Sequence, residues 1–214
     1  MSFDTLAPHY PWMERILAGE KLQRCRTAFL EEIPIPENIL LLGEGHGRCL
    51  AECVRLFPRA KILCVDSSQK MLEQSKRQIE RQTADFRNVE FMRADVLEGK
   101  NNWTIGPHDL VVTNFFLDCF RPEQIESIIL KISWAMTPDA NWLLADFQMA
   151  DGGFKKLRSR MILWLMYRFF RAATRLPARE WTSPDMFMER AGFELRRRVE
   201  REWALLHADW WVRK

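Results

Sequence analysis

Long apolar runs are absent from this sequence of 214 residues. The longest, Met161 to Tyr167, falls well below the roughly 20 apolar residues that cross a bilayer, so no transmembrane helix is expected. The first residues, MSFDTLAPHY, are polar and acidic and lack the apolar stretch of a signal peptide. We therefore expect a cytoplasmic protein.

A large excess of one charge is absent as well. The 32 basic and 29 acidic residues leave a formal charge of +3, too close to balance for a nucleic-acid footprint across the whole surface. Hydrophobic residues (47%) and charged residues (29%) occur in globular proportions. A chain of this length fits one α/β domain, and we expect residues 1–214 to form a single domain.

Metal-binding patterns are lacking too. The cysteines are odd in number, and no histidine or second cysteine pair completes a ligand set around Cys49 and Cys53. We therefore expect no metal site, and we expect the cysteines to be buried apolar thiols. They are Cys25, Cys49, Cys53, Cys64 and Cys119.

Strand and helix patterns alternate between Asn38 and Phe147. Short apolar runs are separated by amphipathic stretches, as in the βαβ units of a parallel sheet. Helices are expected from the end of the first strand to about Leu56, from Gln69 to about Arg81, and from near Pro122. The five expected strands are 39–42, 61–65, 89–92, 109–113 and 142–147.

Helical patterns flank this core. Residues 1–33 have apolar positions near helical spacing and predict a helical cover. Residues 155–176 form one long apolar and basic stretch without a strand pattern, which predicts a helical, lid-like inserted segment at 152–178.

The last part of the chain, 183–214, predicts a short helix and two strands. Ser183 is expected to cap the helix, with Pro184 at its first position and Gly192 after its end. Too little sequence separates the two strands for a crossover helix, so they should pair antiparallel. They are expected at 193–200 and 203–212. The fold class is therefore α/β: a Rossmann-like, doubly wound, mostly parallel seven-stranded sheet with an antiparallel C-terminal hairpin strand and helices on both faces.

Glycines at 43, 45 and 47 separate the first strand from the helix after it. Glycine lets the backbone turn tightly and approach a ligand closely, although a tight strand-to-helix turn alone needs glycine as well. The second strand ends in Asp66, 66 − 47 = 19 residues beyond the last glycine, close to the roughly 20-residue offset of an acid that binds ribose hydroxyls. Arg48 does not fit the G-x-G-x-x-G pattern of dinucleotide sites.

A third polar feature follows the next strand, where Asp95 comes after Arg93 and Ala94. Its carboxylate would accept a hydrogen bond from an adenine amino group, or it would cap a turn. All three features fall at the carboxyl edge of the expected sheet.

With these motifs the sequence resembles the class I S-adenosylmethionine-dependent methyltransferases. The resemblance covers the chain from about Phe3 onward and rests on ILLLGEGHGR, ILCVDSSQKML, VEFMRADVLEG and DLVVTNFFLDCF in order. FDTLAPHYPWME and MFMERAGFELRR are most similar to the ubiquinone and menaquinone biosynthesis group. The resemblance implies that residues 38–147 form a core that binds S-adenosyl-L-methionine, with S-adenosyl-L-homocysteine as product.

The family also implies roles for individual residues. The glycines pass under the methionine half, Asp66 binds the ribose hydroxyls, and Asp95 accepts from the adenine amino group. Leu41 departs from the family, which usually has an acid there, so Glu44 is expected to contact the methionine amino group instead. Tyr10 would close over the cofactor, Met71 and Val96 would flank the adenine, and Asn114 and Phe115 would line the transfer chamber. The full cofactor-binding set is Tyr10, Gly43, Glu44, Gly45, Gly47, Asp66, Ser67, Met71, Asp95, Val96, Asn114 and Phe115.

Methyl transfer from a sulfonium needs alignment and exclusion of water more than catalytic side chains. Aromatic faces, among them Trp12 and Phe116, would favour the sulfonium charge or simply pack in the core. If the acceptor must lose a proton, Asp118 is the first candidate base. The other candidates are His9, His46 and His207.

The acceptor is expected to be a small, apolar, quinone-like or lipid-like molecule. The 155–176 stretch is apolar on most sides and basic at both ends, which suits either a helix packed on the core or a lid that touches an anionic membrane. No nucleic-acid partner is expected, and the oligomeric state stays open.

Three other classes remain open. An NAD(P)-dependent oxidoreductase also uses a glycine loop and a ribose-binding acid. A nucleic-acid methyltransferase would use the arginines near the C-terminus, yet no Asn-Pro-Pro-Tyr motif follows the fourth strand. A methyltransferase-like binding protein without catalysis is the third. The arginines in question are Arg196, Arg197, Arg198 and Arg201.

Overall fold

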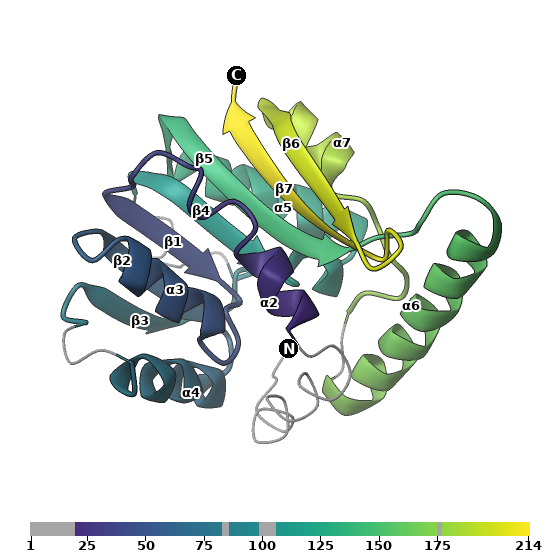
Figure 1. The fold of residues 1–214 in the computed structure, drawn as a ribbon, viewed down its shortest axis with the longest axis horizontal. Helices are drawn as coiled ribbons and strands as arrows, with labels where there is room; N and C mark the ends of the chain where they lie inside the picture. Colours follow the sequence, from purple (N-terminus) through teal and green to yellow (C-terminus); the bar gives the residue numbers. More distant parts are fainter. Residues whose placement is uncertain (1–19, 83–85, 99–105, 175–176) are drawn as a thin grey trace.

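The computed structural model describes residues 20–82, 86–98, 106–174 and 177–214. Strands and helices alternate from α2 to β3, β4 follows β3 with no helix between them among the described residues, and η2 and α5 lead to β5. A long helix, a short helix and two strands come after β5 (Figure 1). The elements are α2 (Lys21–Arg26), β1 (Asn38–Leu42), α3 (Arg48–Leu56), β2 (Lys61–Asp66), α4 (Gln69–Glu80), β3 (Val89–Arg93), β4 (His108–Asn114), the 3₁₀ helix η2 (Leu117–Cys119), α5 (Pro122–Trp134), β5 (Met136–Phe147), α6 (Gly153–Thr174), α7 (Asp185–Arg190), β6 (Phe193–Arg201) and β7 (Leu206–Arg213).

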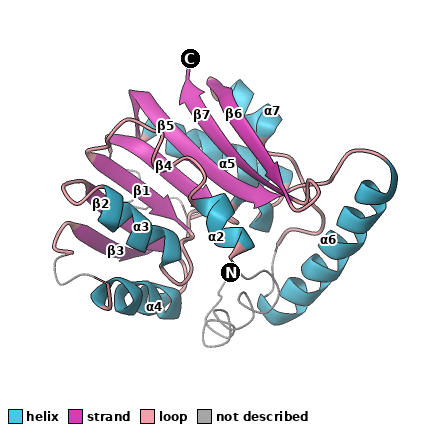
Figure 2. Cartoon of the chain, in the orientation of Figure 1, coloured by secondary structure: helices cyan, strands magenta, loops and turns pink. Residues whose placement is uncertain are grey.

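The seven strands form one sheet in the order β3-β2-β1-β4-β5-β7-β6 (Figure 2). The first five pair in parallel, whereas β7 runs antiparallel to both β5 and β6. The predicted fold class, a doubly wound, mostly parallel seven-stranded sheet with an antiparallel C-terminal hairpin, is confirmed.

Strand β1 shows why the central strands are apolar without alternation. Ile39 and Leu41 pack in the cluster that includes residues of α2, α3 and α4, and Leu40 and Leu42 pack in the cluster that includes residues of α5 and α7. All four side chains are at most 1% exposed. Because helices cover both faces of the sheet, each position of a central strand must be apolar.

The cysteines lie in this interior. Cys25, Cys49, Cys53 and Cys64 are buried and Cys119 is half-buried, and none forms a disulfide. The prediction of buried apolar thiols is confirmed for the first four.

Two boundary predictions near the C-terminus are wrong. Helix α7 begins at Asp185, so Pro184 precedes the helix, and Ser183 makes only a 3.4 Å hydrogen bond, accepting from the Asp185 amide. Trp203 is not in a strand but in the turn between β6 and β7, where Glu202, Trp203 and Ala204 all have positive φ. A left-handed backbone cannot continue a strand, and β7 therefore begins only at Leu206.

The helical cover expected at 1–33 is described only from residue 20. Helix α2 and the turns after it bury Leu22, Phe29 and Leu30 against the sheet. Residues 1–19, with His9, Tyr10 and Trp12, lie outside the described residues.

The expected inserted helix is α6, a single helix of 22 residues. It follows β5 and lies to one side of the sheet (Figure 1). Leu163 and Tyr167 pack against Ala178 and Leu205, which attaches one side of α6 to the domain. Among the described residues, no helix is long and apolar enough to cross a membrane.

Gly47, directly before α3, lies where α4 packs closely against the chain. Its φ is +89°, and a Cβ there would lie 2.6 Å from the Cα of Ser75 in α4. We expect Gly47→Ala to lower the free energy of unfolding by about 1–2 kcal/mol for the left-handed backbone and by a further ~1–3 kcal/mol for the overlap.

Gly192→Ala is the matched control, since Gly192 has φ +88° and nothing within 4 Å of an added Cβ. Denaturant unfolding followed by circular dichroism measures both variants. Equal losses would mean that the approach of α4 does not constrain position 47.

Candidate functional site

A partly open cavity lies at the carboxyl ends of β1 and β2. Its wall is mainly apolar with a few polar groups, which is typical of small-molecule and cofactor sites. The residues that line it are Gly43, Gly45, Val65, Asp66, Ser67, Met71, Ala94, Asp95, Val96, Leu97, Phe115, Phe116, Cys119 and Phe120.

Most of the predicted cofactor-binding residues meet at this cavity. They are Gly43, Gly45, Asp66, Ser67, Met71, Asp95, Val96 and Phe115. Glu44, Gly47, Asn114 and Asp118 do not line it. Tyr10 lies outside the described residues.

The glycine loop is fixed by its neighbours. Gly43 donates a 2.9 Å hydrogen bond to the carbonyl of Val65, and a Cβ on it would lie 2.3 Å from the ring of Phe116. The carbonyl of Gly45 accepts from the hydroxyl of Ser75 at 2.8 Å. Gly45 itself has φ +72° and no atom within 4 Å of an added Cβ, so its backbone borders open space. A ligand can therefore approach the main chain at Gly45.

Glu44, predicted to contact a methionine amino group, has a structural role at the start of α3. Its side chain is buried, and Oε1 accepts from the amides of Cys49 at 2.8 Å and Leu50 at 3.1 Å. A carboxylate at the N-terminus of α3 satisfies amides that have no partner within the helix and favours the helix dipole. Glu44 therefore caps α3, and its side chain does not border the cavity.

Two carboxylates face the cavity from successive strand ends. Asp66 Oδ1 accepts from the amide of Ser68 at 2.8 Å, and Asp95 Oδ1 accepts from the amide of Leu97 at 3.0 Å. In each case the amide comes two residues later, which is an Asx turn. Asp95 thus caps a turn and lines the cavity at once, so the two interpretations considered for it are compatible.

Apolar side chains make up much of the remaining wall. Met71 follows Asp66 by five residues and Val96 follows Asp95 directly, and both are buried. Leu97 is 37% exposed. Phe116 and Phe120 form an edge-to-face pair with ring centroids 5.1 Å apart. Sequence reasoning did not assign Val65, Ala94, Leu97, Cys119 or Phe120 to the site.

Phe115 lies at the junction between β4 and η2. Its φ of +53° is unusual for a bulky residue, and its ring packs 5.1 Å from that of Phe147. The guanidinium of Arg26 lies 5.2 Å from the centroid of the Phe115 ring. Strained backbone at a cavity wall is a common property of binding sites.

Asp118 of η2 and Asp146 of β5 form a buried pair of carboxyl groups. The Asp118 amide donates to Asp146 Oδ2 at 3.2 Å, and the amide of Phe147 donates to Asp146 Oδ1 at 2.8 Å. Tyr167 of α6 donates to the Asp118 carbonyl at 3.1 Å. The Cys119 thiol, whose residue lines the cavity, donates to Asp118 Oδ1 at 3.5 Å.

Burial changes the acidity of this pair. Desolvation raises the pKa of Asp118 to about 6. It also raises the pKa of Asp146 well above the usual range, with the Asp118 charge adding to the effect. A group of raised pKa close to a cavity is a candidate acid or base. Sequence reasoning missed Asp146, although it lies one residue before the end of an apolar strand.

Asn114, expected to line the transfer chamber, is instead buried next to it. Its exposed fraction is 6%, and within the described part of the chain neither its Oδ1 nor its Nδ2 has a hydrogen-bond partner. A buried amide without partners is rare in native proteins.

The candidate histidine bases are placed away from the cavity wall. His207 is buried in β7 with Nδ1 3.1 Å from Asp209 Oδ1, and His46 is buried in the glycine loop. Neither residue lines the cavity. His9 lies outside the described residues.

Three of the four arginines of β6, all except Arg201, are held by partners among the described residues. Arg198 forms ion pairs with Asp185 at 2.9 Å and with Asp209 at 2.6 Å. Arg197 pairs with Glu32, and Arg196 lies 4.4 Å from the ring centroid of Trp210. These contacts are structural, which weakens the case for β6 as a nucleic-acid surface.

The central part of the chain matches a known family. Residues 39–139 match the family model described as a methyltransferase domain. This span includes every residue that lines the cavity.

Two curated relatives are named ribosomal RNA large subunit methyltransferase G. The protein of Aliivibrio fischeri (strain MJ11) is 30% identical over 140 residues, and that of Aliivibrio salmonicida (strain LFI1238) is 26% identical over 140 residues. In both cases the match covers 64% of this chain and 34% of the relative. The chain thus spans about a third of the length of these proteins.

Solved structures share the fold. Mitomycin 7-O-methyltransferase has a TM-score of 0.70 at 16% identity, covering 100% of this chain and 61% of the other. Magnesium protoporphyrin IX methyltransferase from Synechocystis PCC 6803, solved with bound SAH, has a TM-score of 0.64 at 15% identity, covering 91% and 83%. At these identities the likeness establishes the fold alone.

The raised pKa of Asp118 predicts a pH-dependent stability. The Asp118 carboxyl binds a proton more tightly in the folded protein than in the unfolded chain. Its burial therefore has little effect on the free energy of unfolding at about pH 4, where it is protonated in the folded protein, and lowers that free energy fully above about pH 6, where it is ionised. We expect Asp118→Asn to raise the free energy of unfolding by roughly 1–3 kcal/mol near pH 7.5 and to leave it unchanged near pH 4.

Urea titrations at the two pH values measure the effect, and Asp139→Asn, at an exposed position, is the matched control. A stabilisation of equal size at both pH values would contradict the raised pKa.

Proposed function

We propose that this chain, a member of the class I S-adenosylmethionine-dependent methyltransferase superfamily, moves a methyl group from S-adenosylmethionine to a small apolar acceptor. The observation that carries the proposal is the cavity in which open glycine backbone, two fixed carboxylates and apolar walls meet. Family and fold comparisons support it independently.

The residues of the cavity fit the cofactor. Open space next to Gly45 admits a ligand that passes close to the main chain. We assign the glycine loop to the methionine half, Asp66 with Ser67 to the ribose hydroxyls, and Asp95 to the adenine amino group. Met71 and Val96 would then bound the adenine through apolar contact. Asn114, with its unpaired amide, would gain hydrogen bonds from a polar atom of a bound ligand.

When bound, the cofactor supplies a methyl group on a positively charged sulfur. The chain has to align the acceptor with that methyl and keep water out. The Phe115 and Phe116 rings suit both tasks, since they are apolar and their faces favour a nearby positive charge. Cavity walls of this kind favour an apolar, quinone-like or lipid-like acceptor over a highly charged one.

Proton removal, where an acceptor needs it, is assigned to Asp118. Its raised pKa of about 6 makes it a stronger base than an ordinary aspartate. Asp146 would hold Asp118 in place by accepting a hydrogen bond from its backbone amide, while desolvation by burial keeps the pKa of Asp118 high. Because the Asp118 carboxylate does not line the cavity, Cys119 is the lining residue that links it to the cavity.

Methylation of ribosomal RNA is the second candidate function. The names of the curated relatives favour it, although this chain spans about a third of them. The pairing of the β6 arginines and the absence of an Asn-Pro-Pro-Tyr motif after β4 favour the small-molecule acceptor.

The deciding experiment is isothermal titration with S-adenosylmethionine, S-adenosylhomocysteine and NAD. We expect the two adenosyl-sulfur ligands to bind and NAD not to bind. Asp66→Ala should weaken binding by about 10- to 100-fold, because hydrogen bonds to a charged carboxylate are lost.

Asp139→Ala, an equal loss of charge at an exposed position on β5, should bind like the wild type. Binding of NAD alone would point to an oxidoreductase. Absence of all binding would leave a methyltransferase-like protein without a cofactor site, and in both cases the proposal fails.

A further inference from the structure

Exposed apolar side chains are concentrated on one helix. Of the twelve large hydrophobic residues exposed in the described part of the chain, six lie on α6, which makes up 22 of the 214 residues. They are Phe154 (70% exposed), Leu157 (65%), Met161 (58%), Trp164 (61%), Leu165 (54%) and Phe169 (46%).

These six residues lie on the side of α6 that faces away from the domain. Their spacing of three and four residues puts them in one stripe along the helix. The buried residues Ser159, Leu163 and Tyr167 follow the same spacing on the opposite side, where α6 packs on the domain. Helix α6 thus has two apolar faces, and only one of them is covered. We call the uncovered stripe the outer face of α6.

Positive charge surrounds this outer face. Helix α6 carries six basic residues and no acidic residue. In the part of the chain that the structure describes, no ion pair joins any of them to a carboxylate. The six are Lys155, Lys156, Arg158, Arg160, Arg168 and Arg171.

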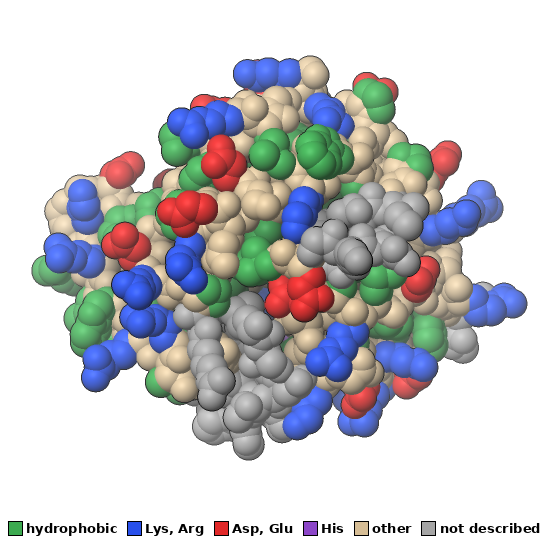
Figure 3. Space-filling model, turned by 180° about the vertical axis from the view of Figure 1, so that it is seen from behind, with side chains coloured by type: hydrophobic (Ala, Val, Ile, Leu, Met, Phe, Trp, Pro, Cys, Tyr) green, Lys and Arg blue, Asp and Glu red, His purple; other side chains and the backbone are tan. Residues whose placement is uncertain are grey.

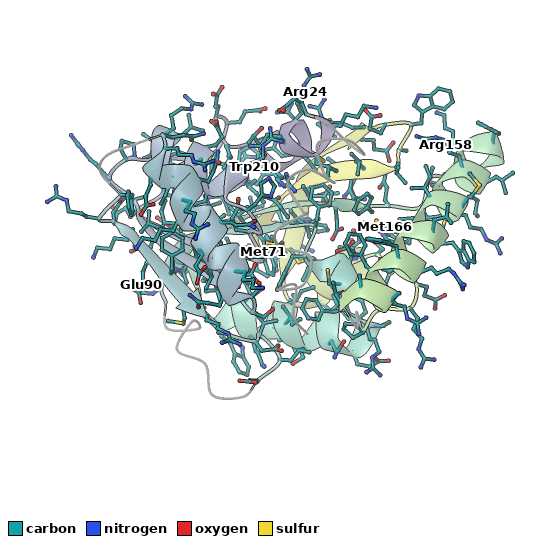
Figure 4. The ribbon with its side chains drawn as sticks, turned by 90° about the horizontal axis from the view of Figure 1, so that it is seen from below. Arg24, Met71, Glu90, Arg158, Met166 and Trp210 are labelled. Carbon is teal, nitrogen blue, oxygen red and sulfur yellow. The ribbon has the colours of Figure 1, made fainter. Side chains whose placement is uncertain are left out.

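Hydrophobic and basic side chains can be seen next to one another at the left of Figure 3, the end of the molecule where α6 lies. Figure 4 views α6 from below and labels Arg158 and Met166 along it. Arg158 also connects α6 to the β6–β7 turn, donating to the Glu202 carbonyl at 3.2 Å and lying 5.8 Å from the ring of Trp203, which is 62% exposed. Trp203 therefore adds an exposed aromatic side chain beside the outer face.

We propose that the outer face of α6 docks this protein on an anionic lipid surface. Helices that lie in a membrane interface combine bulky apolar residues on one side with lysine and arginine at its margins. The apolar residues enter the boundary between head groups and acyl chains, and the cations meet the acidic head groups.

Other occupants match the outer face less well. A second copy of α6 would bring six further positive charges against the first six, which repel. A nucleic acid would pair with the cations, yet exposed aliphatic side chains such as Leu157, Met161 and Leu165 have no favourable contact with phosphates. An anionic membrane accepts both kinds of side chain.

The inference goes beyond the proposed methyl transfer and does not depend on it. Vesicle binding needs neither cofactor nor acceptor, so its outcome is separate from that of the titrations with S-adenosylmethionine. If the protein both docks on lipid and methylates an apolar acceptor, the membrane where it docks would be a source of that acceptor.

Sedimentation of the whole protein with vesicles tests the proposal. We expect binding to mixed phosphatidylcholine and phosphatidylserine vesicles that is at least about tenfold stronger than to phosphatidylcholine alone and falls with added salt. The double variant Trp164→Glu, Leu165→Glu should bind at least about tenfold more weakly, because two apolar anchors become anions. Both positions are exposed, so the fold should be retained.

The matched control is Trp134→Glu, Leu130→Glu on α5, which makes the same substitutions at exposed positions (82% and 42%) outside α6. It should sediment with vesicles like the wild type. Equal effects of the two double variants, or a wild-type protein that stays in solution, would overturn the proposal.

Two further readouts identify the other occupants. Light scattering would show a dimer that only the α6 variant breaks if the outer face binds a second copy. A labelled single-stranded RNA that binds the wild type but not the α6 variant, with no vesicle binding, would mark a nucleic-acid surface. Either result would contradict the docking on lipid.

Discussion

The parallel pairing of β1 with both β2 and β4 is the constraint on which the site depends. Leu42 pairs with Val65 on one side and with Thr113 on the other. The residues that come next, Gly43, Asp66 and Asn114, are therefore brought to the same edge of the sheet. A shift of one residue in either pairing would turn a cavity residue into the apolar interior and bring an apolar side chain to the edge. The burial of β1 on both faces fixes this alignment.

Much of the fold and part of the site could be predicted for this reason. Glycines and acids that directly follow apolar strands fall at one edge of a parallel sheet, and Gly43, Asp66 and Asp95 all line the cavity. Asp146, one residue before the end of β5, follows a similar pattern but was not predicted. The narrower likeness to quinone biosynthesis methyltransferases stays a prediction, as do the individual roles of the site residues.

What could not be predicted depends on contacts between distant segments. Glu44 is adjacent to cavity residues in sequence, yet its carboxylate caps α3, because two amides without helical partners lie within its reach. At Gly47 the approach of Ser75 in α4 leaves no room for a Cβ. The 3₁₀ helix η2 returns Cys119 and Phe120 to the cavity, and no periodicity in the sequence indicates that turn.

The Asx turns at Asp66 and Asp95 have a consequence for the cost of binding. Each carboxylate already accepts a hydrogen bond from the backbone amide two residues later in the chain. Its rotamer is therefore selected when the chain folds. A side chain that is free before binding gives up about 0.5–1.5 kcal/mol of conformational entropy when a ligand immobilises it. In this protein that entropy is lost during folding, and a ligand that reaches the two acids meets groups that are already oriented.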